Sequence, residues 1–395
     1  MKRKTILTML FTAFILTANG QKGLFDSMWE SNDSIPFVWD GGIYLPATID
    51  NKYPANILFT TNANRQLVVD TTYLKEQCWQ PPKIEKANIK REKDTLRLKT
   101  SYTKHDVKFG NTTANFPYML ISDIRNVLGK HADGIMWDTF FEYSPFEVNF
   151  QQKFLRTLTA IPDSVKRNYR CLPLTVRDSK FMIEAYVWLN NKRIGGLYQL
   201  WLGGNDDIFF TSNTVKRHNL MAYKGKTRQL LAQYTNIGDT TTTTTTFALA
   251  DSVRLWLDNI GRVNVSMPMS EEPSHSRMYN AGYIGAGILS NYNLVFDPAH
   301  NKLYCRPYKA HTPEKRTWGF SWINRTDIGK GWIVRSIYKG SAAEKAGIRL
   351  GDTILKVNGK KVENYSWEEE RVLSNDSTIT LLLKTKQGMR KVTLK

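Results

Sequence analysis

Hydrophobic positions along the chain occur in short runs that are rich in β-branched and aromatic residues and are separated by Asn, Asp, Gly and Lys. Runs of this length between turn residues predict antiparallel β structure rather than alternating helices and strands. Clear examples lie at 42–49, 55–60, 181–189, 197–202 and 293–296. Helical patterns are few, and they lie at 71–77, 122–128 and 366–373.

One pattern of strands and turns occurs twice. An apolar strand at 47–50 leads through Asn51-Lys52 into a strand that ends in small or polar residues. The same order returns about 140 residues later, where a strand leads through Asn191-Lys192 into the run at 197–204. Self-similarity in one fixed order indicates an internal duplication.

Each copy also has a matching closing unit, at 132–137 followed by 146–150, and at 281–285 followed by 293–297. We therefore expect a mainly β fold with two duplicated β lobes, at 36–160 and 172–308.

The N-terminus has the pattern of a secretory signal peptide. Basic residues at 2–4 precede an apolar run at 5–17, which ends in Ala18-Asn19-Gly20. The apolar run is shorter than the roughly 20 residues that span a bilayer. We expect residues 1–20 to be cleaved on export to the periplasm, the cell surface or the medium, and no membrane span to remain.

The chain is basic, with 55 Lys and Arg against 36 Asp and Glu. These cations are scattered, which is typical of a solvated surface, and export argues against a nucleic acid partner. Attraction to anionic envelope polymers is the alternative interpretation. Two local features are a Thr run at 240–246, for which we expect an exposed mobile loop rather than an extended hairpin, and a linker at 313–316.

Three cysteines rule out a disulfide scaffold, and their wide spacing provides no metal-binding motif. Either one disulfide with an odd thiol or three reduced thiols is compatible with the positions of Cys78, Cys171 and Cys305. The six His form no HExxH or HxH pair, so we expect no metal and no cofactor. A weak glycine pattern at 285–287 lacks the strand–turn–helix setting of a dinucleotide site.

From Trp318 the sequence resembles a PDZ domain, which would be a small α+β domain at 318–395. The resemblance rests on the run GSAAEKAGIRLGDTILKVNGKKV at 340–362 and on the apolar strand before it. PDZ domains bind an extended peptide as an added strand beside a helix. The resemblance implies that the helix at 366–373 lines this groove and that the loop Trp318-Gly319-Phe320-Ser321 holds the peptide end. This loop departs from the common Gly-Leu-Gly-Phe pattern.

The two lobes, together with the opening segment at 35–46, resemble the retropepsin/pepsin-like aspartyl proteases of bacterial envelopes. In that family each lobe contributes one Asp from an Asp-Thr-Gly or Asp-Ser-Gly turn, and the pair shares a proton and activates water. Here the first position holds Thr60, within Thr60-Thr61-Asn62. The second holds Trp201, within Trp201-Leu202-Gly203-Gly204. The resemblance therefore implies a protease scaffold without its catalytic aspartates.

The apolar-apolar-Gly segment that supports each catalytic turn is kept in one lobe only. The second lobe has Tyr283-Ile284-Gly285, whereas the first has Trp137 in place of the glycine. Other acids near the two turns, Asp206 and Asp207 in the second lobe and Asp133 and Asp138 in the first, fit ordinary carboxylates of turns and strand ends. An acid that substituted for a missing aspartate would restore general acid–base chemistry.

We expect an exported pseudoprotease that binds extended peptide or segments of envelope proteins through its cleft and its PDZ groove. Two alternatives remain open at this point. The chain could be an active aspartic-type endopeptidase that uses a non-standard acid such as Asp206. It could also bind anionic envelope polymers, in which case its affinity would fall steeply with salt.

Overall fold

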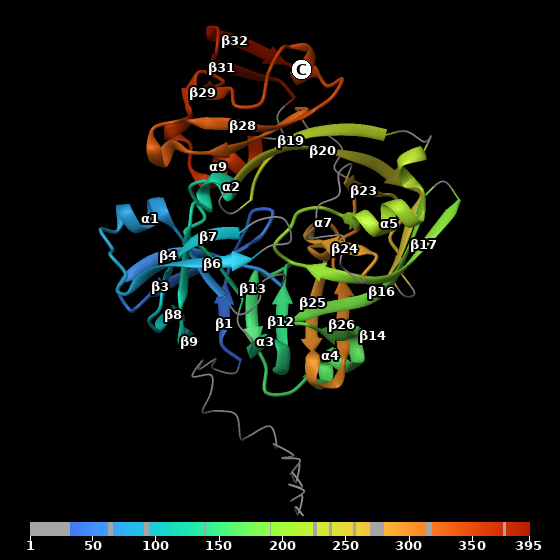
Figure 1. Cartoon of the computed structure of the whole chain (residues 1–395). Helices are drawn as coiled ribbons and strands as arrows, with labels where there is room; N and C mark the ends of the chain where they lie inside the picture. The colour runs from blue at the N-terminus through green and yellow to red at the C-terminus, as the bar shows by residue number, and fades with distance from the viewer. Residues whose placement is uncertain are drawn as a thin grey trace, which may run out of the picture.

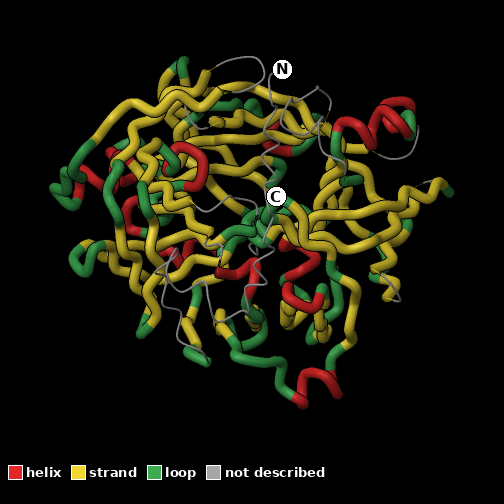
Figure 2. Tube along the Cα trace, turned by 60° about the horizontal axis from the view of Figure 1, so that its bottom comes forward, coloured by secondary structure: helices red, strands yellow, loops and turns green. Residues whose placement is uncertain are grey.

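The computed structural model describes residues 32–395, apart from 62–65, 91–94, 138–139, 190, 224–226, 237–238, 256–257, 269–279, 313–317 and 374–376. The predicted signal peptide and linker lie outside the described residues. The fold is mainly β, as the sequence predicts, and Figure 2 shows short helices among many strands. None of the described helices is long and apolar enough to cross a membrane.

The first repeat, residues 34–157, contains one large sheet. Its strands are β2 (Val38–Trp39), β3 (Ile43–Ile49), β4 (Tyr53–Phe59), β5 (Gln66–Asp70), β6 (Ile84–Lys90), β7 (Thr95–Ser101), β8 (His105–Phe109), β9 (Thr112–Phe116), β10 (Met119–Ser122) and β11 (Gly134–Trp137). Its helices are α1 (Thr71–Glu76), α2 (Arg125–Leu128) and α3 (Phe140–Tyr143). The strand order is β9-β8-β3-β4-β11-β5-β10-β7-β6, and β2 pairs with β3.

The second repeat, residues 170–307, follows the helix α4 (Asp163–Asn168). Its sheet contains β15 (Thr175–Arg177), β16 (Lys180–Leu189), β17 (Lys192–Trp201), β18 (Ile208–Phe210), β19 (Thr227–Asn236), β20 (Asp239–Ala250), β21 (Ser252–Leu255), β22 (Asp258–Asn259), β23 (Val263–Pro268) and β24 (Gly282–Gly285). Short helices are α5 (Ser212–Arg217), η1 (Leu220–Ala222) and α7 (Ala286–Leu289). The order β22-β21-β16-β17-β24-β18-β23-β20-β19 reproduces that of the first repeat, strand for strand.

The correspondence extends to strand direction. β11 pairs parallel with β4 and antiparallel with β5, and β24 pairs in the same two ways with β17 and β18. The hairpin turns match as well, because Asn51 and Asn191 both have a positive φ, near +54° and +62°. Asn tolerates this left-handed conformation better than most residues do, which explains the repeated Asn-Lys turns in the sequence.

A third sheet joins the two repeats. It consists of β1 (Ser34–Pro36), β13 (Phe154–Thr157), β12 (Phe146–Asn149), β25 (Tyr292–Asp297), β26 (Lys302–Pro307) and β14 (Arg170–Pro173), in that order, with η2 (Pro298–His300) between β25 and β26. The central pairing, β12 with β25, places Phe146 opposite Phe296, and their rings stack with centroids 4.5 Å apart. One hydrophobic core therefore runs through both repeats.

The C-terminal domain has its own core and lies above both repeats in Figure 1. Its strands are β27 (Phe320–Asn324), β28 (Trp332–Tyr338), β29 (Thr353–Val357), β30 (Lys360–Lys361), β31 (Ile379–Thr385) and β32 (Gly388–Leu394). Its helices are η3 (Thr326–Ile328), α8 (Ala342–Lys345), η4 (Val362–Asn364) and α9 (Trp367–Val372). A capping box of Ser366 and Glu369 starts α9.

The Thr run at 240–246 corrects one expectation. It is not an exposed mobile loop but the first part of β20, which pairs along its length with β19 and at its later residues with β23. β-branched residues favour strands, and two partner strands satisfy the backbone groups that a loop would leave to water. The same hairpin reaches the C-terminal domain, because β19 pairs with β28 through Leu230, Leu231 and Ala232.

Candidate functional site

Thr60 and Trp201 occupy equivalent positions in the two repeats of the structure. Thr60 directly follows β4, beside β11, and its N–H donates to Met136 O at 3.2 Å. Trp201 ends β17, beside β24, where its partner is Gly285. The repeated topology therefore puts a hydroxyl and an indole at corresponding points of the two repeats.

Thr61 links these two turns directly. Its buried hydroxyl donates to Leu200 O at 2.7 Å and accepts a hydrogen bond from Leu202 N–H at 3.1 Å. The partners are the residues on either side of Trp201, so one side chain of the first repeat satisfies two backbone groups of the second. Leu202 has no hydroxyl with which to make the reciprocal bonds.

Around Trp201 the chain is closely packed. A Cβ atom added to Gly203 would lie 2.5 Å from Thr60 Oγ1 and 3.3 Å from Trp201 Nε1, so these groups meet at this glycine. The Trp201 ring packs over Gly204, where an added Cβ would lie 2.5–2.6 Å from three ring carbons. Neither a threonine hydroxyl nor an indole can ionise and relay protons as a shared carboxyl pair does.

Trp137 fills the core of the first repeat rather than a cleft. The side chain is fully buried and contacts the rings of Phe59, Phe141 and, across the repeats, Phe181. The corresponding position in the second repeat, Gly285, has no room for a side chain, since an added Cβ would lie 2.1 Å from Asp206 O. This close backbone approach explains the glycine in the second repeat.

The acids near these turns have structural partners. Asp206 accepts a hydrogen bond from Ser266 Oγ at 2.9 Å, and burial, together with the charge of Asp207, raises its pKa. Asp207 accepts hydrogen bonds from the backbone and side-chain N–H groups of Asn264 and lies 3.3 Å from His311 Nε2. Both carboxylates therefore bind side chains and backbone groups close to the turn from which they come.

In the first repeat, Asp133 pairs with Arg125 Nη2 at 2.6 Å and accepts a hydrogen bond from Asn56 N–H at 2.7 Å. Asp138 lies outside the described residues. No group of three or more His, Cys, Asp or Glu residues suited to a metal ion occurs in the described part of the chain. The three cysteines are free thiols, with Cys78 and Cys171 exposed and Cys305 buried.

The predicted peptide-end loop lines an interdomain cavity of about 460 Å³. The C-terminal domain contributes this loop together with residues of β27, β28 and α9, and both repeats complete the wall. The lining residues are Trp318, Phe320, Ser321, Trp322, Ile323, Asn324, Ser336, Tyr338, Glu370 and Arg371 of the C-terminal domain, Asp40, Gly41, Leu128, Gly129 and His131 of the first repeat, and Asn205 of the second. Gly319, the remaining residue of the loop, has a φ of +83° and packs against Ser341.

Helix α9 forms one wall of this cavity and is held by the first repeat. Trp367 donates from Nε1 to Asp40 Oδ2 at 2.5 Å, and its indole stacks on the imidazole of His131 with centroids 4.5 Å apart. Arg371 donates from Nη1 to Trp39 O at 2.8 Å. Burial raises the pKa of Asp40, although its hydrogen bond from Trp367 acts in the opposite direction.

A buried charge network also holds the C-terminal domain against the first repeat. Arg125 of α2 makes contacts at 2.8 Å with Glu76, 2.6 Å with Asp133 and 3.3 Å with Asp327, the last of which belongs to the C-terminal domain. Burial alone would lower the pKa of this guanidinium, but its hydrogen bonds to Glu76 and Asp133 raise it. Arg325 adds hydrogen bonds to Asn126 and Thr72. Polar contacts between the first repeat and the C-terminal domain therefore hold the walls of the cavity in place.

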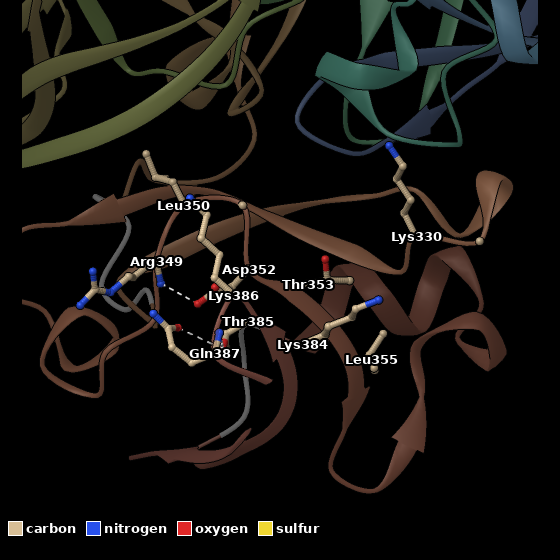
Figure 3. A pocket seen from close by; sticks show the side chains of 12 residues that line it. Lys330, Arg349, Leu350, Asp352, Thr353, Leu355, Lys384, Thr385, Lys386 and Gln387 are labelled. Carbon is tan, nitrogen blue, oxygen red and sulfur yellow. Dashed lines mark hydrogen bonds between the residues drawn. The ribbon is translucent and has the colours of Figure 1, made fainter. Parts of the chain in front are cut away.

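A second pocket, of about 490 Å³, lies on another face of the C-terminal domain. It is rich in cations, and Figure 3 shows Lys330 on the side toward the first repeat, with Arg349 and Lys386 on the opposite side. Lys384 completes the set of four. The one carboxylate in the lining, Asp352, is buried and accepts a hydrogen bond from Arg349 N–H at 2.8 Å. None of the four cations forms an ion pair with another described residue.

The predicted loop and helix α9 both line the cavity, whereas nothing in the sequence indicated that the two repeats contribute to it. Asp40, Leu128, His131 and Asn205 carry no motif and lie far from residue 318 in the chain. Only the docking of the domains brings them there, so no local signal could have identified them.

Comparison with known proteins identifies one part of the chain. Residues 333–385 match the PDZ domain family. The chain therefore contains a C-terminal PDZ domain, as its sequence predicts, and this domain indicates peptide or protein binding. No curated protein matches the chain.

Proposed function

We propose that the chain is an exported peptide-binding protein whose two repeats form a retropepsin/pepsin-like scaffold without a catalytic pair. The interdomain cavity carries this proposal, because it combines walls from both repeats with the outer edge of β27, a strand that pairs with β28 alone among the described strands. A sheet edge binds extended peptide through main-chain hydrogen bonds, and surrounding side chains provide selectivity.

The duplicated strand order and the Thr61 contacts support the pseudoprotease part of the proposal. Thr60 and Trp201 stand at equivalent turn positions that are joined by Thr61, where a protease of this type needs two carboxylates. Without them the usual general acid and general base are both missing. The N-terminal pattern supports export, and we propose the periplasm or the cell exterior as the location.

An assay of residues 21–395 on a diverse peptide library from pH 3 to 8, with pepstatin as a control, separates binding from cleavage. We expect selective retention of peptides without hydrolysis. Pepstatin-sensitive cleavage would overturn the pseudoprotease assignment and support the alternative of an active endopeptidase with a non-standard acid.

The location of binding is tested by filling the cavity. Leu128→Trp adds bulk to its wall, whereas Val372→Trp places the same side chain at an exposed position on α9, where Val372 is 52% exposed. We expect Leu128→Trp to weaken peptide binding and Val372→Trp to leave it unchanged. Equal affinities in both variants would place the peptide elsewhere.

The cation-rich pocket supports a second candidate function, the binding of an anionic envelope polymer. Four cations without a described carboxylate partner favour a polyanion, and such binding weakens steeply as salt screens the charges. Heparin serves as the probe. Loss of heparin binding in Lys384→Gln/Lys386→Gln, with peptide binding retained, would establish this pocket as a separate site, whereas salt-insensitive or absent heparin binding would reject it.

A further inference from the structure

The cation-rich pocket of the PDZ domain continues into an apolar pocket on the same face. The apolar pocket has a volume of about 340 Å³ and shares Gly329 and Leu355 with the cation-rich pocket. Its other large apolar lining residues are Val362, Leu382 and Met389. None of the described lining residues of either pocket lines the interdomain cavity, so this surface is separate from the groove beside β27 and α9.

Strand pairing explains why lysines and apolar side chains alternate on this face. Lys384 of β31 lies opposite Met389 of β32, and Leu382 lies opposite Lys391. Side chains alternate between the two faces of a strand, so residues 382 and 384 share one face. Leu383, between them, is fully buried in the core on the other face. The outer face of this sheet therefore carries apolar and cationic side chains side by side.

The apolar side chains of this face are accessible. Met389 is 57% exposed, and Ile328, in the segment 326–331 that forms one wall, is 41% exposed. Leu355 and Leu382 are half-buried. Figure 3 shows Leu355 and Lys384 on the same side of the cation-rich pocket, where the two kinds of lining meet. An exposed apolar patch with a polar rim is typical of a binding surface.

The carboxylates that line the two pockets already have partners. Asp352 accepts from Arg349 N–H at 2.8 Å, and Glu363 pairs with Lys361 at 3.1 Å. The four cations of the first pocket form no ion pair with another described residue. Charge complementarity therefore favours an anionic group in the first pocket, whereas the second favours a hydrocarbon chain.

We infer that the two pockets together bind a lipid with a phosphate head. The head lies among the four cations, and the chain lies against Leu355, Leu382 and Met389. A phosphate monoester carries a charge of about −1.5 to −2 at neutral pH, and its oxygens fit the guanidinium of Arg349, so it suits several cations better than one carboxylate does. This inference rests on the second candidate function, because both place an anion among these cations, but it specifies a lipid rather than a polymer.

The test titrates the protein from residue 21 onward with octyl, decyl and dodecyl phosphate, below the concentrations at which they form micelles. We expect dodecyl phosphate to bind and each two-carbon shortening to weaken binding about fivefold, because less hydrocarbon leaves water. Octanol, which has a chain without the charge, and inorganic phosphate should both bind at least about tenfold more weakly than octyl phosphate.

Two exposed substitutions separate the head from the chain. Lys384→Gln removes a cation and should weaken all three alkyl phosphates by a similar factor, about fivefold. Met389→Ser removes apolar surface and should weaken dodecyl phosphate more than octyl phosphate. Lys339→Gln and Val372→Ser are the matched controls, at exposed positions of the same domain outside both pockets, and should change neither. Thermal unfolding verifies that the variants fold.

Several outcomes would overturn the inference. Affinities that do not depend on chain length, or a Met389→Ser variant that binds dodecyl phosphate as the parent does, would remove the apolar pocket from the site. Decanoate that binds as tightly as decyl phosphate would contradict the phosphate head. Heparin binding that dodecyl phosphate does not displace would overturn the inference while the second candidate function stands. A protein that binds neither heparin nor any alkyl phosphate would reject both.

Discussion

The hydroxyl of Thr61 donates a hydrogen bond to the carbonyl oxygen of Leu200 at 2.7 Å, across the boundary between the two repeats. The same hydroxyl accepts from Leu202 N–H. Because the two partners flank Trp201, this contact fixes the turn that holds the indole against the turn that holds Thr60. The contact between these two turns is thus maintained by Thr61, the residue that follows Thr60.

Thr61→Val should destabilise the protein by about 2–4 kcal/mol. It keeps the shape of the side chain but leaves a buried carbonyl and a buried N–H without their partner, each worth about 1–3 kcal/mol. Denaturant unfolding measures the loss. Thr113→Val, at a half-buried strand position, is the matched control and should change stability by less than about 1 kcal/mol. Equal losses in the two variants would contradict the role of the inter-repeat contact.

Arg125→Met should cost about 3–5 kcal/mol, because it leaves the buried carboxylate of Asp133 without its cation and removes one of the two arginines that pair with Asp327. Since Asp327 belongs to the PDZ domain, we also expect the domain to loosen, which small-angle X-ray scattering would detect as a larger radius of gyration. Arg349→Met, at an exposed arginine, should stay within about 0.5 kcal/mol of the parent. A mild effect of Arg125→Met would show that the network is dispensable.

Asp206→Asn and Asp207→Asn should have opposite effects at neutral pH. The pKa of Asp206 is raised by burial, so its favourable contribution is complete below the ordinary value of an Asp and is lost as the pH rises through the raised value. Replacing it by Asn, which can still accept from Ser266, should therefore raise stability more at pH 7 than at pH 4. Thermal unfolding across this range measures the difference.

Asp207→Asn should instead destabilise the protein, because it removes the negative charge beside the buried His311. The pair also tests the alternative of an active enzyme, because any cleavage by the parent that stays unchanged in both variants would remove Asp206 and Asp207 as catalytic candidates. Destabilisation of equal size in both variants would contradict the assigned pKa direction of Asp206.

Thiol labelling with Ellman's reagent at pH 8 should show two fast cysteines and one slow one. Cys78 and Cys171 are exposed, whereas burial raises the pKa of Cys305 to about 11, so that little of its thiolate is present. Cys171→Ser should remove one of the two fast equivalents, and Cys305→Ser should leave both. A disulfide between any two of the three residues would appear as a single reactive thiol.

Short apolar runs, repeated Asn-Lys turns and glycine-rich closing units provided the β class, and the sequence of 340–362 provided the PDZ domain. These signals are local, because turn chemistry and strand patterning depend on residues within a few positions of one another. The Thr run shows the limit of such reasoning. Its composition fits a loop or a strand equally well, and only pairing with β19 and β23 decides between them.

By itself, the sequence determined that this is a mainly β protein with a C-terminal PDZ domain and an internal repeat of its strand and turn pattern. The tertiary structure decided that the loop at 318–321 and helix α9 face the two repeats across one cavity, and that Lys130 N–H donates to Asn324 O at the end of β27. It also brought His131 and Arg371 to the same indole. These residues come from distant parts of the chain, and only the packing of whole domains places them together.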